Sequence, residues 1–155
     1  MAQGGVERAI ELASRAFDGR TDRQGDPYIG HAIRVMRDVE GDDAQMVALL
    51  HDVFEWGTVS LRDFVKQKFP KRVVDAVDAL TKREGESLAE HIDRVHASEL
   101  ASVVKIAHLR DNACSWRLDR IDDASLRDEL LAMYRETAEL MGTTLEEICG
   151  DRLER

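Results

Sequence analysis

The chain has 155 residues, of which 43% are hydrophobic and 34% are charged, and its formal net charge at pH 7 is −9. A chain of this length suits one hydrophobic core, so residues 1–155 are expected to form a single domain. The acidic balance, without a local basic patch, argues against a nucleic-acid partner. No stretch is long and apolar enough to cross a membrane and no signal region begins the chain, so a cytoplasmic protein is expected.

The residue types favour helices over sheets. Aromatic residues make up 5% of the chain and there are two prolines, whereas Ala, Leu, Glu, Asp and Arg are abundant. No stretch alternates as a strand would, and no repeat or linker interrupts the chain. Cys114 and Cys149 lack metal-site spacing and do not make a disulfide framework, so reduced, partly buried thiols are expected. We therefore predict an all-α fold, a single compact helical bundle.

Apolar residues recur at spacings of three and four almost from end to end. Pro27 stands where a helix would begin after the polar loop 18–26, and Gly41 breaks that helix before the next. Ser60 is suited to cap a short helix, and Pro70 opens another. The predicted helices span about 6–17, 27–39, 43 to near Gly57, 60–69, 70–80, 87–97, 99–114 and 123–148, with a polar loop at 81–86.

Three places put metal-binding side chains on the inner faces of predicted helices. His51 points to the core side of its helix with Asp52 next to it, His31 lies near the start of the second helix, and His108 follows the apolar stretch SVVKIA. A His–Asp pair can ligate one divalent ion, and the other two imidazoles could complete its shell. A single inward histidine is more often a satisfied core side chain, so spacing alone leaves both interpretations open.

Other titratable residues carry weaker signals. Glu55 lies four residues after His51, on the same face of the predicted helix. Its carboxylate could hold or deprotonate a water molecule at a metal, or it could be a solvated side chain at a helix end. His91 shares a face with apolar residues and is expected to pack or to line a pocket, whereas His96 is expected at the surface.

Four segments, in order and at plausible separations, resemble the signatures of the RelA/SpoT-type hydrolase domain. They are GDPYIGHAIRVM (25–36), AQMVALLHDVFEW (44–56), VDALTKREGES (77–87) and VVKIAHLRDN (103–112). The resemblance covers about residues 5–118 and is closest in pattern to the stand-alone alarmone hydrolases. It implies an HD-domain helical fold, one divalent ion, usually Mn²⁺, and hydrolysis of the 3′-diphosphate from guanosine tetra- or pentaphosphate.

The resemblance also implies roles for individual residues. His31, His51 and Asp52 match three of the family's metal ligands. Glu55 matches the first carboxylate of a Glu–Asp pair that handles water and protons. Asn112 matches a residue that lines the nucleotide site, and with Glu55 it is a candidate catalytic residue.

Four further residues are candidates for substrate binding. Tyr28 and Lys105 match motif positions, although either could instead be structural. Arg20 and Arg23 lie in the loop before Pro27 and could contact the base or a phosphate, since guanidinium suits phosphate geometry. Exposed arginines are usually only solvated, and the sequence does not distinguish between these two.

Two positions depart from the family pattern. Trp56 replaces the second catalytic carboxylate, and the loss of a positioned acid–base group typically costs about 10²–10⁴ in rate. His108 replaces the aspartate that is the fourth metal ligand. Imidazole is also a good ligand, so His108 stays the predicted fourth ligand, and the change favours zinc or iron over manganese. Asp111 could bind instead, but the family pattern does not support it.

Two functions therefore follow from the sequence. The first is a metal-dependent phosphohydrolase acting on a nucleotide, most closely a guanosine 3′,5′-bis(diphosphate) 3′-pyrophosphohydrolase, with weakened or redirected activity. The alternative is an HD-domain pseudoenzyme that binds metal or nucleotide, in which Trp56 could stack on a base. The chain carries no segment resembling a synthetase, so it is expected only to degrade or bind alarmones. A homodimer is plausible from the family, but nothing in the sequence fixes it.

Overall fold

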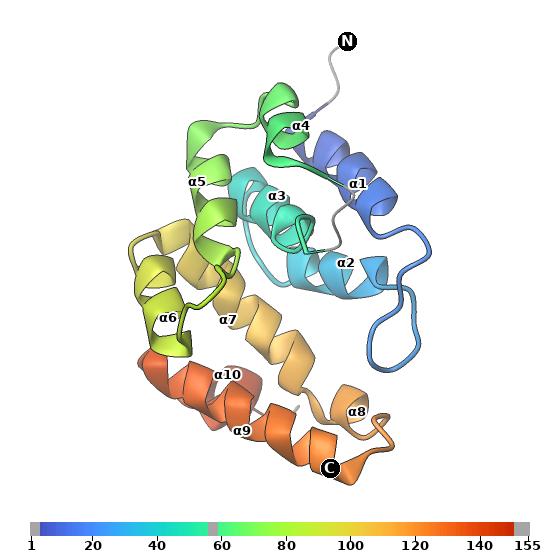
Figure 1. Cartoon of the computed structure of the whole chain (residues 1–155), viewed down its shortest axis with the longest axis vertical. Helices are drawn as coiled ribbons and strands as arrows, with labels where there is room; N and C mark the ends of the chain where they lie inside the picture. The colour runs from blue at the N-terminus through green and yellow to red at the C-terminus, as the bar shows by residue number, and fades with distance from the viewer. Residues whose placement is uncertain (1–3, 56–58, 151–155) are drawn as a thin grey trace.

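The computed structural model describes residues 4–55 and 59–150, and the helices within them build a compact bundle (Figure 1). The described residues contain no strand, only one isolated bridge between Thr21 and Pro27. The all-α prediction is therefore confirmed. The helices are α1 (Gly5–Ala16), α2 (Ile29–Arg37), α3 (Asp42–Leu50), α4 (Leu61–Lys66), α5 (Lys71–Leu80), α6 (Leu88–His96), α7 (Glu99–Ala113), α8 (Ser115–Leu118), α9 (Ala124–Leu140) and α10 (Leu145–Cys149).

Two helices form the centre of the bundle. After its polar first turn, helix α3 is apolar on all sides, with every residue from Met46 to Leu50 buried, and it packs against α1, α2, α5 and α7. A helix without a polar face is stable only when it is surrounded. Helix α7 is the longer of the two and packs against helices from both ends of the chain (Figure 1). It therefore joins the two halves of the molecule.

The buried apolar side chains fall into two clusters that meet along α7. The larger cluster contains side chains of α1, α2, α3 and α5 together with Ala101, Val104 and Ala107 of α7. The smaller cluster contains Leu109 and Ala113 of α7 with side chains of the last three helices. Because α7 contributes to both, residues between Lys105 and Asn112 lie where the two clusters adjoin.

Two helix predictions were wrong. The third predicted helix was expected to run to near Gly57, but α3 ends at Leu50 and residues 51–55 form turns. Gly57 lies outside the described residues. The predicted helix 123–148 is two helices, α9 and α10, because Gly142 adopts a φ of +82° that ends the first helix, and Thr144 caps the second. The short helix α8 was not predicted.

Other local predictions were confirmed. Ser60 begins α4 with a capping box, in which its hydroxyl accepts from the Asp63 amide and the Asp63 carboxylate accepts from the Ser60 amide. The polar loop 81–86 lies between α5 and α6. Cys114 and Cys149 are buried thiols. Among the described residues, no helix has the length and apolar character needed to span a membrane.

Candidate active site

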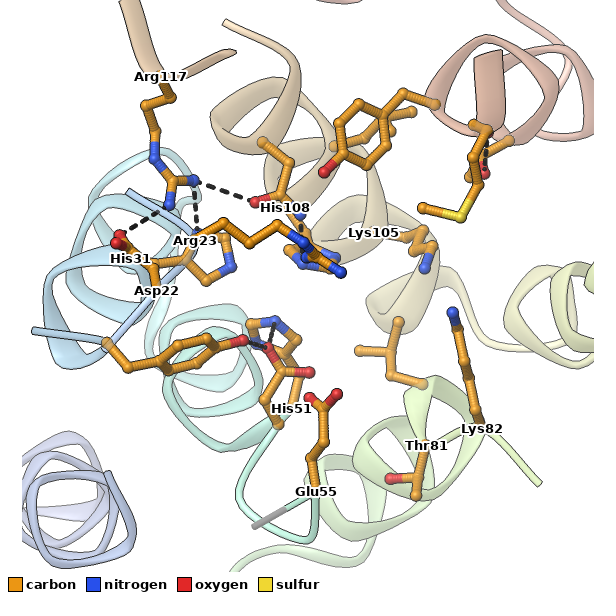
Figure 2. A pocket seen from close by; sticks show the side chains of 18 of the residues that line it. Asp22, Arg23, His31, His51, Glu55, Thr81, Lys82, Lys105, His108 and Arg117 are labelled. Carbon is orange, nitrogen blue, oxygen red and sulfur yellow. Dashed lines mark hydrogen bonds and ion pairs between the residues drawn. The ribbon is translucent and has the colours of Figure 1, made fainter. Parts of the chain in front are cut away.

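Four of the predicted residues lie together at the centre of the bundle (Figure 2). His31 comes from α2, His51 and Asp52 follow α3 directly, and His108 comes from α7. Each offers one ligand atom, and these atoms lie within 4.8 Å of one another, so the group could hold a metal ion. The ring centroids of His51 and His108 are 4.7 Å apart, and those of His31 and His108 are 5.0 Å apart. We call these four residues the histidine cluster.

The end of α3 explains how two consecutive residues reach one point. Within an α-helix, successive side chains diverge by about 100° around the axis. Because α3 ends at Leu50, the chain turns at His51 and Asp52, and the side chains converge until Nε2 of His51 lies 2.9 Å from Oδ2 of Asp52. The early end of the helix, which the apolar spacing did not predict, therefore builds the His–Asp pair.

Two ring nitrogens in the cluster lack a hydrogen-bond partner. Nδ1 of His31 lies 2.6 Å from Oδ2 of Asp111, and Nδ1 of His51 lies 2.6 Å from the carbonyl oxygen of Ala48, so each Nδ1 carries the proton that it donates. Nε2 of both rings is buried without a hydrogen bond, and the contact of His51 with Asp52 lacks hydrogen-bond geometry. Unsatisfied buried lone pairs are costly unless something binds them. A divalent cation fits this donor set.

The pKa values of the cluster reflect burial and close charges. Burial lowers the pKa of His31 and holds that of His108 well below its usual value, and neighbouring imidazoles add to the effect. Burial also disfavours the charged form of His51, but the carboxylate of Asp52 outweighs it and raises the pKa of that ring. Burial works to raise the pKa of Asp52, but the His51 charge holds it well below its usual value. His31 and His108 are thus held neutral, the form in which an imidazole binds a metal.

Tyr28 fixes the carboxylate of the cluster. Its hydroxyl donates to Oδ2 of Asp52 at 2.6 Å, and burial together with the Asp52 charge raises the pKa of Tyr28 above its usual range. The hydroxyl therefore stays protonated and remains a donor. Tyr28 also lines the cavity described next, so the structure is compatible with the predicted substrate contact and adds a contact with the cluster.

The histidine cluster lies at one side of a cavity of about 620 Å³. Glu55, Asn112, Lys105 and Arg23 line this cavity, as predicted substrate or catalytic residues should, whereas Arg20 is not among its lining residues. An apolar part of the wall comes from α7, from α9 and from the segment before α9. This part includes Leu109, Ile121, Met133 and Tyr134. A cavity with polar groups at one side and apolar groups at another is typical of a small-molecule site.

Glu55 reaches the cavity by a route other than the predicted one. It does not lie one turn after His51 on a helix, because residues 51–55 are turns, but its carboxylate points into the cavity (Figure 2). Burial and the charge of Asp52 raise its pKa above the usual value. Asn112 donates from Nδ2 to Nε2 of His108 at 2.9 Å, so it contacts the cluster as well as the cavity.

Two lysines bring positive charge to the opposite part of the cavity. Lys105 is 8% exposed, and burial together with the charge of Lys82 lowers its pKa to about 8. The two ammonium groups point toward each other across the cavity (Figure 2). In the part of the chain that the structure describes, neither makes an ion pair with a carboxylate. The sequence prediction included Lys105 but missed Lys82, which stands in the third resembling segment.

A buried arginine behind the cluster was not predicted. Arg117 is 3% exposed and bonds to Asp22, Asp111 and Asn112. Asp111, considered as a substitute ligand, instead accepts from His31, Arg34 and Arg117, which outweigh burial and lower its pKa to about 2. Asp22 and Arg117 are 95 positions apart, so no local pattern could have paired them.

The remaining candidates lie elsewhere or outside the described residues. His91 is 2% exposed and packs beside Glu86 and Arg94 rather than lining the cavity, and His96 is exposed as predicted. Trp56 lies outside the described residues.

Comparison with known proteins gives both sequence and structural similarity, although no family model matches the chain. The chain is 30% identical to a GTP pyrophosphokinase of Streptomyces coelicolor over 151 residues, which is 88% of this chain and 18% of that protein. It is 33% identical to the bifunctional (p)ppGpp synthase/hydrolase SpoT of Escherichia coli over 81 residues, which is 50% of this chain and 11% of that protein. The chain thus spans less than a fifth of the curated relatives that it matches.

A solved structure, that of a metazoan ortholog of SpoT that hydrolyses ppGpp, shares the fold. The TM-score is 0.75 at 23% sequence identity, and the match covers 96% of this chain and 95% of that chain. Because nearly the whole of both chains superposes, the described bundle is the HD-domain fold that the motifs predicted. The four resembling segments and the shared fold agree.

Proposed function

We propose that this chain, which resembles the RelA/SpoT-type hydrolases in sequence and in fold, is a metal-dependent phosphohydrolase that acts on a nucleotide carrying a diphosphate. The observation that carries the proposal is the histidine cluster, with its unpartnered buried nitrogens, at the side of a cavity that also holds two lysines without ion-pair partners. Function is argued from this site, since the fold alone hosts many activities.

The cluster would hold one divalent ion through His31, His51, Asp52 and His108. When bound, such an ion supplies Lewis acidity toward a phosphoryl oxygen and makes a water molecule more acidic. Three imidazoles and one carboxylate favour zinc or iron more than an aspartate-rich set would, whereas the resemblance of the motifs implies manganese. The donor set has one negative charge fewer than the family pattern.

The lysines support an anionic substrate with phosphate groups on two sides. Lys105 is a buried cation without a carboxylate partner, and a buried charge of this kind is stable only when an anion compensates it. Lys82 adds a second donor from the opposite wall. A nucleotide that places one diphosphate at the cluster and another phosphate at the lysines would satisfy both. Guanosine 3′,5′-bis(diphosphate) has this arrangement and is the substrate class that the relatives' names indicate.

Glu55 is the group that would move protons. Its carboxylate points into the cavity and its raised pKa makes it a better base than a solvated glutamate. In the proposed reaction, water attacks the phosphorus attached to the 3′-oxygen. The bond between this phosphorus and the 3′-oxygen breaks, and pyrophosphate and the nucleoside 5′-diphosphate form. Glu55 takes the proton from the water and returns one to the 3′-oxygen. Asn112 would hold the substrate beside the cluster.

A pseudoenzyme that binds nucleotide is the second candidate. The observation in its favour is in the sequence, where Trp56 replaces the carboxylate that would share the proton transfer with Glu55. An aromatic side chain offers a stacking surface to a base but cannot exchange a proton. This protein would keep the affinity for the nucleotide and lose turnover.

The experiment is the release of pyrophosphate from guanosine tetraphosphate by the purified chain, with Mn²⁺, Zn²⁺ and Fe²⁺ supplied separately. His51→Ala is the test variant, because it removes one cluster nitrogen. His96→Ala is the matched control, because His96 is exposed and outside the cavity. We expect turnover in the wild type and the control, and none in His51→Ala.

The outcomes separate the two candidates. Turnover that disappears only in His51→Ala supports a metal phosphohydrolase and shows that Trp56 is tolerated. Absence of turnover with every metal, together with nucleotide binding measured by calorimetry, supports the pseudoenzyme. Absence of both turnover and binding overturns the assignment to alarmones.

A further inference from the structure

We propose that Arg117 is a positioning residue that fixes the orientation and tautomer of one imidazole of the histidine cluster, His31, through Asp111. The inference rests on the proposed metal site, because its functional consequence is the affinity of that site for a cation. Arg117 lies outside all four segments that resemble the RelA/SpoT-type signatures. Figure 2 shows its guanidinium directed toward the cluster and the loop that carries Asp22.

A single guanidinium nitrogen contacts the partners of both rings. Nη1 of Arg117 donates to Oδ2 of Asp111 at 2.8 Å and to Oδ1 of Asn112 at 3.0 Å. Nη2 donates to Oδ2 of Asp22 at 2.9 Å and to Oε1 of Gln24 at 3.0 Å. The planar fork of arginine allows these bonds at once, whereas the single ammonium of lysine could not reach all of them.

The contact with Asp111 decides where His31 carries its proton. Oδ2 of Asp111, the oxygen that Arg117 holds, accepts from Nδ1 of His31 at 2.6 Å. With its proton on Nδ1, the ring has its lone pair on Nε2, which is buried and unpartnered. A carboxylate behind a histidine is the arrangement that fixes the tautomer of metal-binding imidazoles.

The contact with Asn112 acts on the other ring. Because Oδ1 of Asn112 accepts from Arg117, its Nδ2 must face Nε2 of His108, to which it donates at 2.9 Å. A ring nitrogen that accepts a hydrogen bond carries no proton. The Asn112 amide thereby occupies the lone pair of Nε2 of His108, so Arg117 keeps a ligand nitrogen both unprotonated and free only on His31, through Asp111.

Arg34 provides the matched control that the chain offers. It also holds Asp111, but it donates mainly to Oδ1, at 2.8 Å, and it does not contact Asn112. Its side chain is 33% exposed and stacks over Trp116, and its bond to Oδ2, the oxygen facing His31, is 3.3 Å long, against 2.8 Å for that of Arg117. If the ion pairs around Asp111 were only structural, replacing Arg34 or Arg117 would have the same effect on the His31 ring and on cation affinity. A positioning role makes Arg117 the one that matters for the His31 ring.

The test combines two measurements on the full chain. Nitrogen-15 NMR of the histidine rings in metal-free protein reports which nitrogen is protonated, and calorimetric titration with Zn²⁺ and with Mn²⁺ reports cation affinity. The variants are Arg117→Met, Arg117→Lys, Asp111→Asn and the control Arg34→Ala, each checked for folding by circular dichroism. We expect the three test variants to lose the fixed Nδ1–H form of His31 and to bind cation about 10–100-fold more weakly. Arg34→Ala should keep the tautomer and stay within about threefold.

The outcomes distinguish this inference from the proposed function. If the wild type binds no cation, the proposed metal site fails, and the ring spectra of the metal-free variants still test the positioning role. If the wild type binds cation and any folded test variant keeps both the wild-type ring spectra and the wild-type affinity, the inference is overturned. Should Arg117→Met fail to fold, Asp111→Asn decides, because it keeps the shape of the side chain and removes only its charge.

Discussion

Two arginines hold two sides of the cavity in different ways. Arg117 is buried and bonds to side chains that contact the histidine cluster, on the side where Figure 2 shows His31. Arg94 is 21% exposed in its side chain and holds the loop 81–86, which brings Lys82 to the other side. It donates to the backbone oxygens of Asp78, Ala79 and Thr81 and to the carboxylate of Glu86.

The difference shows which side must be rigid. The loss of Arg94 would leave three backbone oxygens, which carry no charge, and one carboxylate, that of Glu86. The loss of Arg117 would leave the carboxylates of Asp22 and Asp111, which are 4% and 10% exposed, with fewer compensating charges. In the proposed function, the side that would hold a metal needs fixed ring orientations, whereas the side that would meet phosphate needs charge that can adjust to it.

The largest expected effect is on stability. Removing one partner of a buried ion pair typically costs about 3–5 kcal/mol, so Arg117→Ala should lower the free energy of unfolding by about that amount. Arg94→Ala should cost about 1.5–3 kcal/mol, the range for hydrogen bonds to a charged group. Urea denaturation of the wild type and both variants measures these losses in the free energy of unfolding, provided that the slope of that free energy against urea concentration is unchanged. An equal or larger loss in Arg94→Ala would break the comparison between the two sides.

The second effect is on anion affinity, and it compares the two lysines. Lys105→Met should weaken the binding of pyrophosphate about 10–100-fold, because a buried charged donor contributes about 1.5–3 kcal/mol. Lys82→Met should weaken it only a few-fold, because the exposed Lys82 is screened by solvent. Calorimetric titration with pyrophosphate near pH 7 measures both constants. Equal losses would mean that burial of Lys105 does not concentrate its charge on the ligand.

Part of this site could be predicted from the sequence, because it depends on residues that are close together in the chain. The last five residues of α3 are all apolar, so His51 and Asp52 at its end had to lie near the core. The order of the four resembling segments predicted the HD-domain fold. The end of α3 was predicted too late because Val53 is buried and Phe54 half-buried, and both continue the helical spacing. Turns that bury their side chains give the same apolar pattern as a helix turn.

The parts that could not be predicted depend on long-range pairing. Arg117 has no motif, and its contacts reach Asp22, 95 positions earlier, and Asp111, only six earlier. An arginine without a motif is usually solvated, and only the fold shows that Arg117 is buried. The break at Gly142 was missed for a similar reason, since Leu145 and Ile148 continue the apolar spacing beyond it.

A third prediction concerns Lys105 and alkaline pH. The pKa of Lys105 is about 8 in the folded chain and near its ordinary value of 10.5 when unfolded. Between these values the unfolded chain binds more protons, so this group makes folding more favourable as pH rises from about 8 to about 10.5. The stability of the wild type relative to Lys105→Met should therefore increase over that window, as thermal or urea unfolding at several pH values can measure. A constant difference would show that Lys105 is not held in a low-dielectric position.

The smallest expected effect tests the Arg94 side alone. Hydrogen bonds from Arg94 lower the pKa of Glu86 to about 2, below the ordinary 4.5. A carboxyl group with a lowered pKa contributes stability that is fully present above its unfolded pKa and is lost as pH falls toward the folded value. The stability difference between the wild type and Glu86→Gln should thus shrink as the pH falls from about 4.5 to about 2, and it should stay constant above about pH 4.5. Since the cluster side does not include Glu86, the NMR signals of the His31 ring should be the same in this variant at neutral pH, and a change in them would show that the two sides are coupled.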